Sequence, residues 1–152
     1  TYIMRREGKT YDEMDELLNR QSGILGVSGV GSDMRDVLAA AEAGNEQAAL
    51  AIDMYVYKVQ KAIGSFYAVM TRTDAVVVTA GIGENSWELR ERIFAGLAHM
   101  GMILDRERNH VTGQIGVNRI ISIDDSPIKI CVVTTDEEMR IARETDALVS
   151  RG

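Results

Sequence analysis

The chain has one cysteine, one proline, few aromatic side chains (5%) and no long apolar run. A single cysteine, Cys131, excludes an intrachain disulfide, and because it lies in an apolar strand pattern we expect a buried structural thiol. The scarcity of proline and aromatic residues is typical of a helix-rich protein. No apolar run approaches the roughly 20 residues that cross a bilayer, and no secretory leader opens the sequence. We therefore expect a soluble, cytoplasmic protein with no membrane partner.

Basic residues are fewer than acidic residues. Lysine and arginine total 17 against 23 aspartate and glutamate residues, which gives a net charge of −6. A nucleic-acid partner would require a basic face, so this balance argues against one. It does not exclude a small anionic ligand, because local amides or a metal can outweigh a distant net charge. At 152 residues the chain is long enough for one domain with a core, and no repeat, low-complexity tract or linker divides it.

Helices dominate the first half of the sequence. The spacing of Thr10 and Glu13 is that of a capping box, which predicts a helix from Tyr11 to about Asn19. The glycine-rich segment 23–31 is predicted to be a loop.

A second helix is predicted to follow Ser32 or Asp33 and to stop near Gly44, and a third, long one begins at Asn45. Apolar residues recur along the third helix at steps of three and four positions, at Ile52, Tyr55, Val56, Val59, Ile63, Phe66, Tyr67 and Met70. A stripe of this length requires a broad apolar partner.

A short strand followed by closely spaced glycines is the most informative segment, and it reads DAVVVTAGIGEN over residues 74–85. The β-branched residues 76–78 predict a strand buried on both faces, and Gly81 and Gly83 let the main chain turn with its amides facing outward. Asn85 or Ser86 then caps a helix whose positive end would face a bound anion.

The same glycine pattern has neither the third glycine of a dinucleotide fingerprint nor the G-K-[ST] of a P-loop. The residues by themselves therefore leave two interpretations open, a phosphate site and a tight strand-to-helix connection.

The helix after this turn has an apolar face of Leu89, Ile93 and Leu97, and its other face is predicted to carry Glu88, Arg90, Glu91 and Arg92. Strands are predicted over 102–104, 118–123 and 128–133, and a capping box over 135–138 starts a terminal helix. Only the strands around Val76 and Ile130 are predicted to be central, joined in a β-α-β pattern.

The histidines do not indicate a metal site. His99 lies at a helix end and His110 in a predicted polar loop, and neither has a cysteine or carboxylate at ligand spacing. A zinc site is therefore not expected.

The exact residue sequences of three segments indicate a family more specifically than the periodicity of their apolar residues does. TAGIGENSWELRERI resembles the adenosine-binding segment of the acetate kinase family, and LLNRQSGILGVSGVGSDMRDV and TTDEEMRIARETDALV resemble the same family in the same order. The resemblance implies an α/β fold, a partial ribonuclease-H-like (actin-like ATPase) domain, helix-rich with a few central strands. It covers only the C-terminal part of the family. We therefore expect residues 1–152 to be a C-terminal nucleotide-binding portion, with the N-terminal domain and the first part of this domain upstream, in a homodimer.

The resemblance also implies which residues bind the nucleotide and the metal ion. Those expected to contact the nucleotide are Asp33, Met34, Arg35, Gly81, Ile82, Gly83, Glu84 and Asn85. Glu137 is expected to hold the Mg²⁺ that accompanies ATP, although the chain has Asp136 where the family usually has asparagine. No catalytic residue is assigned, because the family's catalytic histidine belongs to a segment that this sequence lacks.

Structural explanations for the same residues stay open. Asp33 is a favoured N-cap residue, and Arg35 in the first turn could simply be solvated. Glu137 lies where a helix dipole favours a carboxylate, and it could form a capping box of its own with Thr134.

The function implied by the resemblance is the reversible, Mg-dependent transfer of a phosphoryl group between ATP and acetate by the complete enzyme. This portion would supply the platform for ATP or ADP, and by itself it would show negligible turnover. The nearer alternative is a kinase for propionate or another short-chain carboxylate, with the corresponding acyl phosphate as product. The more distant one is a noncatalytic nucleotide-binding or assembly module.

Overall fold

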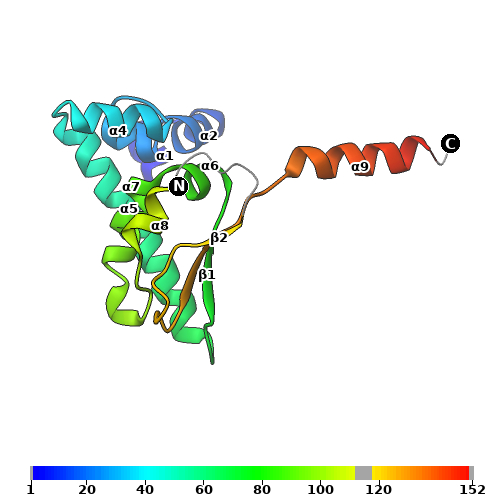
Figure 1. The fold of residues 1–152 in the computed structure, drawn as a ribbon. Coiled ribbons are helices and arrows are strands. Elements are labelled where there is room, and N and C mark those ends of the chain that lie inside the picture. Colours follow the sequence, from blue (N-terminus) through cyan, green and yellow to red (C-terminus); the bar gives the residue numbers. More distant parts are fainter. Residues whose placement is uncertain (1, 112–117, 151–152) are drawn as a thin grey trace. The chain divides into compact units, whose positions relative to one another are not determined.

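The computed structural model describes residues 2–111 and 118–150, and these divide into two compact units, Thr1–Lys61 and Ala62–Gly152. Each unit is described by itself. Helices make up most of both, and the strands all belong to the second (Figure 1).

The first unit is entirely helical. It contains α1 (Tyr2–Glu7), α2 (Tyr11–Arg20), α3 (Gly23–Ser28), α4 (Met34–Glu42) and the first part of α5 (Glu46–Val69).

The capping box predicted for α2 is confirmed. The Thr10 hydroxyl accepts from the Glu13 amide at 3.3 Å, and the Glu13 carboxylate accepts from the Thr10 amide at 2.8 Å. The loop predicted over 23–31 is wrong, because its first part forms α3. Gly29 then ends that helix at φ +65°, in the left-handed conformation typical of a glycine after a helix.

The long helix α5 begins where predicted. The Asn45 side chain accepts from the amide of Ala48 at 3.1 Å and so caps its first turn. The buried apolar residues of the unit come from α2, α4 and α5, and they are Met14, Met34, Val37, Ala48, Ala51 and Ile52. The apolar stripe of α5 is thus buried only in its first part. Further along, Phe66 is 62% exposed and Met70, just after the helix, is 52% exposed.

The second unit is built on a small mixed sheet. Strands β1 (Ala75–Val78), β2 (Arg119–Ile120) and β3 (Lys129–Val132) lie in the order β1-β3-β2. The central strand β3 is parallel to β1 and antiparallel to β2, with Val76 opposite Ile130. The predicted β-α-β arrangement of the two main strands is confirmed (Figure 1).

Other strand predictions are wrong in extent or burial. Residues 102–104 form only an isolated bridge, from Leu104 to Ser122, and segment 118–123 is strand only over β2. Val77 is 55% exposed and Cys131 is half-buried, so neither β1 nor the thiol is enclosed as expected. The reason is that Val77 and Cys131 lie opposite each other on one face of the sheet, which is incompletely covered, whereas Ile130 and Val132 are buried on the other face.

Helices α6 (Ala80–Asn85), α7 (Trp87–Ala95) and α8 (Arg106–His110), with a 3₁₀ turn η1 (Ala98–Met100), separate β1 from β2. The apolar core of the unit consists of Leu89, Ile93, Phe94, Leu97, Met102, Ile121, Ile128, Ile130 and Val132. The predicted apolar face of α7 is therefore confirmed. Its predicted polar face is wrong at one position, because Arg90 is only 2% exposed. His110 ends α8 and does not lie in a loop.

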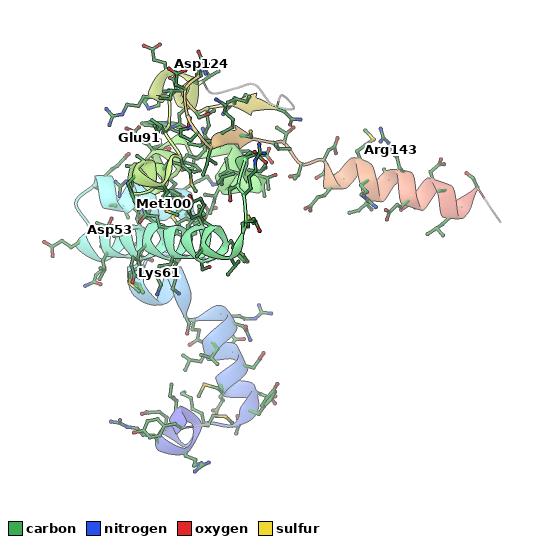
Figure 2. The ribbon with its side chains drawn as sticks, turned by 90° about the horizontal axis from the view of Figure 1, so that it is seen from below. Asp53, Lys61, Glu91, Met100, Asp124 and Arg143 are labelled. Atoms are coloured by element: carbon green, nitrogen blue, oxygen red, sulfur yellow. The ribbon has the colours of Figure 1, made fainter. Side chains whose placement is uncertain are left out.

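The terminal helix α9 (Glu137–Val149) has no buried residue, and in Figure 2 side chains extend from it on several sides around Arg143. Its N-cap is Asp136, whose carboxylate accepts from the Met139 amide at 2.9 Å. The capping boxes expected from Thr134 and Thr135 are therefore not formed. Among the helices of the described residues, none is long and apolar enough to cross a membrane.

Candidate functional site

The segment expected to be a glycine turn is a short helix. After β1, Thr79 is extended and Ala80 has φ +58°, and α6 then contains Gly81 to Asn85. The predicted helix start is confirmed for α7, whose N-cap is Ser86, although the Ser86 side chain makes no capping hydrogen bond. The short helix α6 before it was not predicted. Ala80 takes the left-handed conformation that was expected of a glycine. For a residue with a Cβ this costs about 1–2 kcal/mol.

The glycines of α6 differ in their surroundings. A Cβ on Gly83 would lie 3.1 Å from the carbonyl carbon of Val78 and 3.3 Å from its Cβ, whereas a Cβ on Gly81 would meet nothing within 4 Å. Gly83 therefore allows α6 to pack closely on the end of β1. Gly81 borders open space, into which a ligand could approach.

Asn85 does not cap α7. Its side-chain amide donates to the Gly81 carbonyl at 3.0 Å, one turn back in the same helix. Asn85 was expected to cap the next helix and to contact the nucleotide. In the structure its side-chain NH₂ group forms a hydrogen bond within α6.

Glu84 connects α6 to the segment that leads into α9. One oxygen of its carboxylate, Oε1, accepts from the Ala80 amide at 2.8 Å, the Thr135 amide at 3.0 Å and the Thr135 hydroxyl at 3.1 Å. These hydrogen bonds, the one from the Thr135 amide foremost, lower the pKa of Glu84 below its ordinary 4.5. Glu84 is therefore an ionised side chain that joins two segments 51 residues apart.

Arg90 supports the same helix from the buried side of α7. Its Nη1 donates to the carbonyl oxygens of Gly83 at 2.8 Å and Glu84 at 2.9 Å. Its Nε and Nη2 donate to the side chain and main chain of Asn109, at 2.7 and 3.0 Å. Burial lowers the pKa of Arg90 to about 10, so the guanidinium stays charged at neutral pH. The sequence pattern missed this residue, because an arginine between Leu89 and Glu91 has no local feature that indicates burial.

Glu137 is the exposed first residue of α9 and follows Thr135 by two positions. No group of three or more histidine, cysteine, aspartate or glutamate side chains lies together for metal binding in the part of the chain that the structure describes. Glu137 fits Mg²⁺ as a single oxygen ligand, since this ion commonly uses one or two carboxylates together with water and phosphate oxygens.

The Asp33-Met34-Arg35 triplet belongs to the first unit. Asp33 caps α4 by accepting from the Arg35 amide at 2.9 Å, and the Arg35 guanidinium donates to both carboxylate oxygens of Asp33, at 3.1 and 2.6 Å. The guanidinium, followed by the amide, lowers the pKa of Asp33 to about 2. Met34 is buried, so its side chain belongs to the core of the unit. The capping interpretation of Asp33 is thus confirmed, and Arg35 is held beside it.

The structure brings Gly81–Asn85 and the segment before Glu137 together in the second unit, through Glu84 and Thr135. The histidines lie apart from these contacts. The His110 ring packs against Trp87, with 4.0 Å between ring centroids, and its Nε2 lies 3.3 Å from Glu91, which is labelled in Figure 2. His99 lies in η1.

Comparison with known proteins gives a consistent result. The model of the Acetokinase family matches residues 1–143. The acetate kinase of Methanosarcina thermophila is 47% identical over 148 residues, which are 97% of this chain and 36% of that relative. The crystal structure of Porphyromonas gingivalis acetate kinase superimposes with a TM-score of 0.85 at 39% identity, over 97% of this chain and 37% of that one.

A propionate kinase from Francisella tularensis is also similar, with a TM-score of 0.81 at 36% identity over 94% of this chain and 35% of that one. The chain spans 35–37% of the length of the curated relatives that it matches. Its helix-rich α/β fold is that of part of these kinases, as the resemblance implied.

Proposed function

The chain belongs to the acetokinase family, and we propose that it is the C-terminal, nucleotide-binding portion of an acetate kinase. The complete protein would pass a phosphoryl group reversibly between ATP and acetate, with ADP and acetyl phosphate as the other pair of reactants. The observation that carries this proposal is the junction of β1 and α6, where open Gly81 lies on a helix joined through Glu84 to the segment before Glu137.

The proposed nucleotide contacts are Gly81 to Asn85 in the second unit and Asp33 to Arg35 in the first. Glu84 would take part through its main chain, because its carboxylate accepts from Ala80 and Thr135. At Gly81 the absence of a Cβ leaves room for the base, the sugar or the α-phosphate. Arg35 would stack on the base or bond its polar edge, and Asp33 would accept from ribose or amino groups. Met34 would take part through its main chain, because its side chain is buried.

Glu137 would hold the Mg²⁺ that accompanies ATP. The ion neutralises phosphate charge when it is bound, and the chain's own contribution is to hold a carboxylate in reach of it. Phosphoryl transfer needs an aligned donor and acceptor and positive charge around the transferred group. In the family the side chains that supply this charge, and the acid pocket, belong to upstream segments. We therefore assign no catalytic residue here, and we propose a homodimeric, cytoplasmic enzyme with no nucleic-acid partner.

A hydroxylamine trap for acetyl phosphate tests the proposal on the 152-residue chain and on a version extended upstream to the length of the relatives. The extended protein should form acetyl phosphate from ATP and acetate, and the short chain should not. Substantial product from the short chain would contradict the proposed division of tasks.

A propionate kinase is the second candidate, favoured by the similarity to the Francisella tularensis structure. The nucleotide portion would be nearly the same in both, since the acid is selected elsewhere. Rates of the extended protein on acetate, propionate and butyrate separate the two. A noncatalytic module is distinguished by calorimetry, because it would show no saturable binding of Mg·ADP.

A further inference from the structure

Glu84 was expected to contact the nucleotide, but in this structure its carboxylate is engaged within the protein. Oε1 accepts from Ala80 and twice from Thr135, at 2.8 to 3.1 Å. A ligand donor at this oxygen would have to displace one of these partners. The Glu84 carboxylate therefore joins the start of α6 to the segment that leads into α9.

We propose that Glu84 is a positioning residue that couples nucleotide binding to metal binding. The inference rests on the proposed function, since it takes Gly81 as a nucleotide contact and Glu137 as the metal ligand. Glu84 would hold α6 and the start of α9 in one arrangement, so that both act on the same Mg·nucleotide.

The Glu84 carboxylate restrains the segment that leads to Glu137. Both the amide and the hydroxyl of Thr135 donate to the same oxygen, which restrains the position and the rotation of this residue. Glu137 is two residues further along, so its Cα lies within about 7 Å of the Thr135 Cα even in a fully extended chain. A restraint on Thr135 is therefore a restraint on Glu137.

Ala80 is the one non-glycine residue with positive φ within ranges 2–111 and 118–150. Its amide donates to Glu84, so the same carboxylate that holds Thr135 also holds the left-handed residue that starts α6. Strained residues of this kind persist only where surrounding contacts hold them. A neutral side chain at this position, as in Glu84→Gln, would accept more weakly and so would loosen both segments together.

The opposite end of α6 is fixed independently. Arg90 donates to the carbonyl oxygens of Gly83 and Glu84 and is buried, so α6 keeps this support when the Glu84 carboxylate is changed. Glu84 is only half-buried. A Glu84→Gln variant should therefore fold, and its effect on ligand binding can be read separately.

The experiment measures ADP affinity by calorimetry, with and without Mg²⁺, on the extended protein and its Glu84→Gln variant. We expect Mg²⁺ to strengthen ADP binding in the unchanged protein and this enhancement to fall by about tenfold in the variant, a coupling of ordinary size. Affinity for metal-free ADP should fall less than this, because Arg90 still holds the other end of α6. Glu88→Gln is the matched control, because the hydrogen bond that Glu88 accepts from Ser86 is long, at 3.4 Å, and lies at the start of α7.

Two further variants test whether Glu84 affects Mg²⁺ binding by positioning Glu137. If Glu84 acts through Glu137, adding Glu84→Gln to a Glu137→Gln variant should cause no further loss of the Mg²⁺ enhancement. Thr135→Val, which removes only the hydroxyl donor, should cause a smaller loss than Glu84→Gln. A purely structural role would instead lower the melting temperature without changing the response to Mg²⁺.

The contrary results are distinct. Equal weakening of ADP binding with and without Mg²⁺ would make Glu84 a direct nucleotide contact, and an unchanged enhancement would remove its coupling role. Either overturns this inference and leaves the proposed function standing. Absence of ADP binding by the unchanged protein would overturn the proposed function itself.

Discussion

Arg90 and Asn109 lie 19 residues apart in the sequence and are joined by a pair of buried hydrogen bonds. Asn109 in turn donates to the Trp87 carbonyl at 3.0 Å, and Arg90 donates to the carbonyls of Gly83 and Glu84 in α6. This cluster, which we call the Arg90 network, joins α6, α7 and α8.

Replacing Arg90 by lysine should destabilise the fold. Lysine keeps a positive charge but lacks the planar fork that serves four acceptors at once, so buried carbonyls lose their donors. We expect a loss of about 1–3 kcal/mol in the free energy of unfolding, measured by urea denaturation. Arg143→Lys on exposed α9 is the matched control and should change little. Equal stability of the two variants would show that the Arg90 network does not stabilise the fold.

The glycines of α6 should respond to substitution in opposite ways. Gly83→Ala places a methyl group 3.1 Å from the Val78 carbonyl carbon and should cost about 1–3 kcal/mol in stability through overpacking. A Cβ at position 81 has nothing within 4 Å, so Gly81→Val should keep the fold while nucleotide binding weakens strongly. Thermal unfolding and calorimetry with Mg·ADP on both variants check the pair. Unchanged affinity in Gly81→Val would remove Gly81 from the proposed site.

The Asp33–Arg35 contact should give stability a pH dependence in acid. The pKa of Asp33 is about 2, below its ordinary 3.8, so the folded state is favoured while the carboxylate is ionised. That contribution should be present above about pH 4 and be lost as the pH falls towards 2. Asp33→Asn should flatten the stability curve over this interval, measured by denaturation at several pH values. Arg35→Met should return the NMR-measured pKa of Asp33 towards its ordinary value.

Glu137 and Glu138 provide a matched pair for the metal proposal, since both are exposed carboxylates in the first turn of α9. Glu137→Gln should weaken the Mg²⁺-dependent part of ADP binding at least about tenfold, because it removes the proposed carboxylate ligand. Glu138→Gln should leave it nearly unchanged. The measurement is calorimetry of ADP across a series of Mg²⁺ concentrations in the extended protein. Equal effects of the two substitutions would indicate a general charge effect and contradict a ligand role for Glu137.

Features that depend on neighbours in the sequence could be predicted well. The Thr10–Glu13 capping box, the apolar face of α7 and the β-branched strand β1 each rest on contacts or periodicity within a few residues. The family could also be predicted from three short segments, because their residue sequences are specific. The match to the family over residues 1–143 confirms that prediction. The error at α6 was local as well: the glycines were taken to form the turn, but Ala80 adopted the left-handed conformation, with its amide held by Glu84.

By itself, then, the amino-acid sequence determined which segments are helix and strand in outline, and to which family the chain belongs. Only the tertiary structure decided that Arg90 is buried, that Gly83 packs on Val78 while Gly81 faces open space, and that Glu84 holds Thr135. The reason is physical. Periodicity and capping report energies between residues a few positions apart, whereas these contacts join segments up to 51 residues apart and form only when the sheet and its helices pack together.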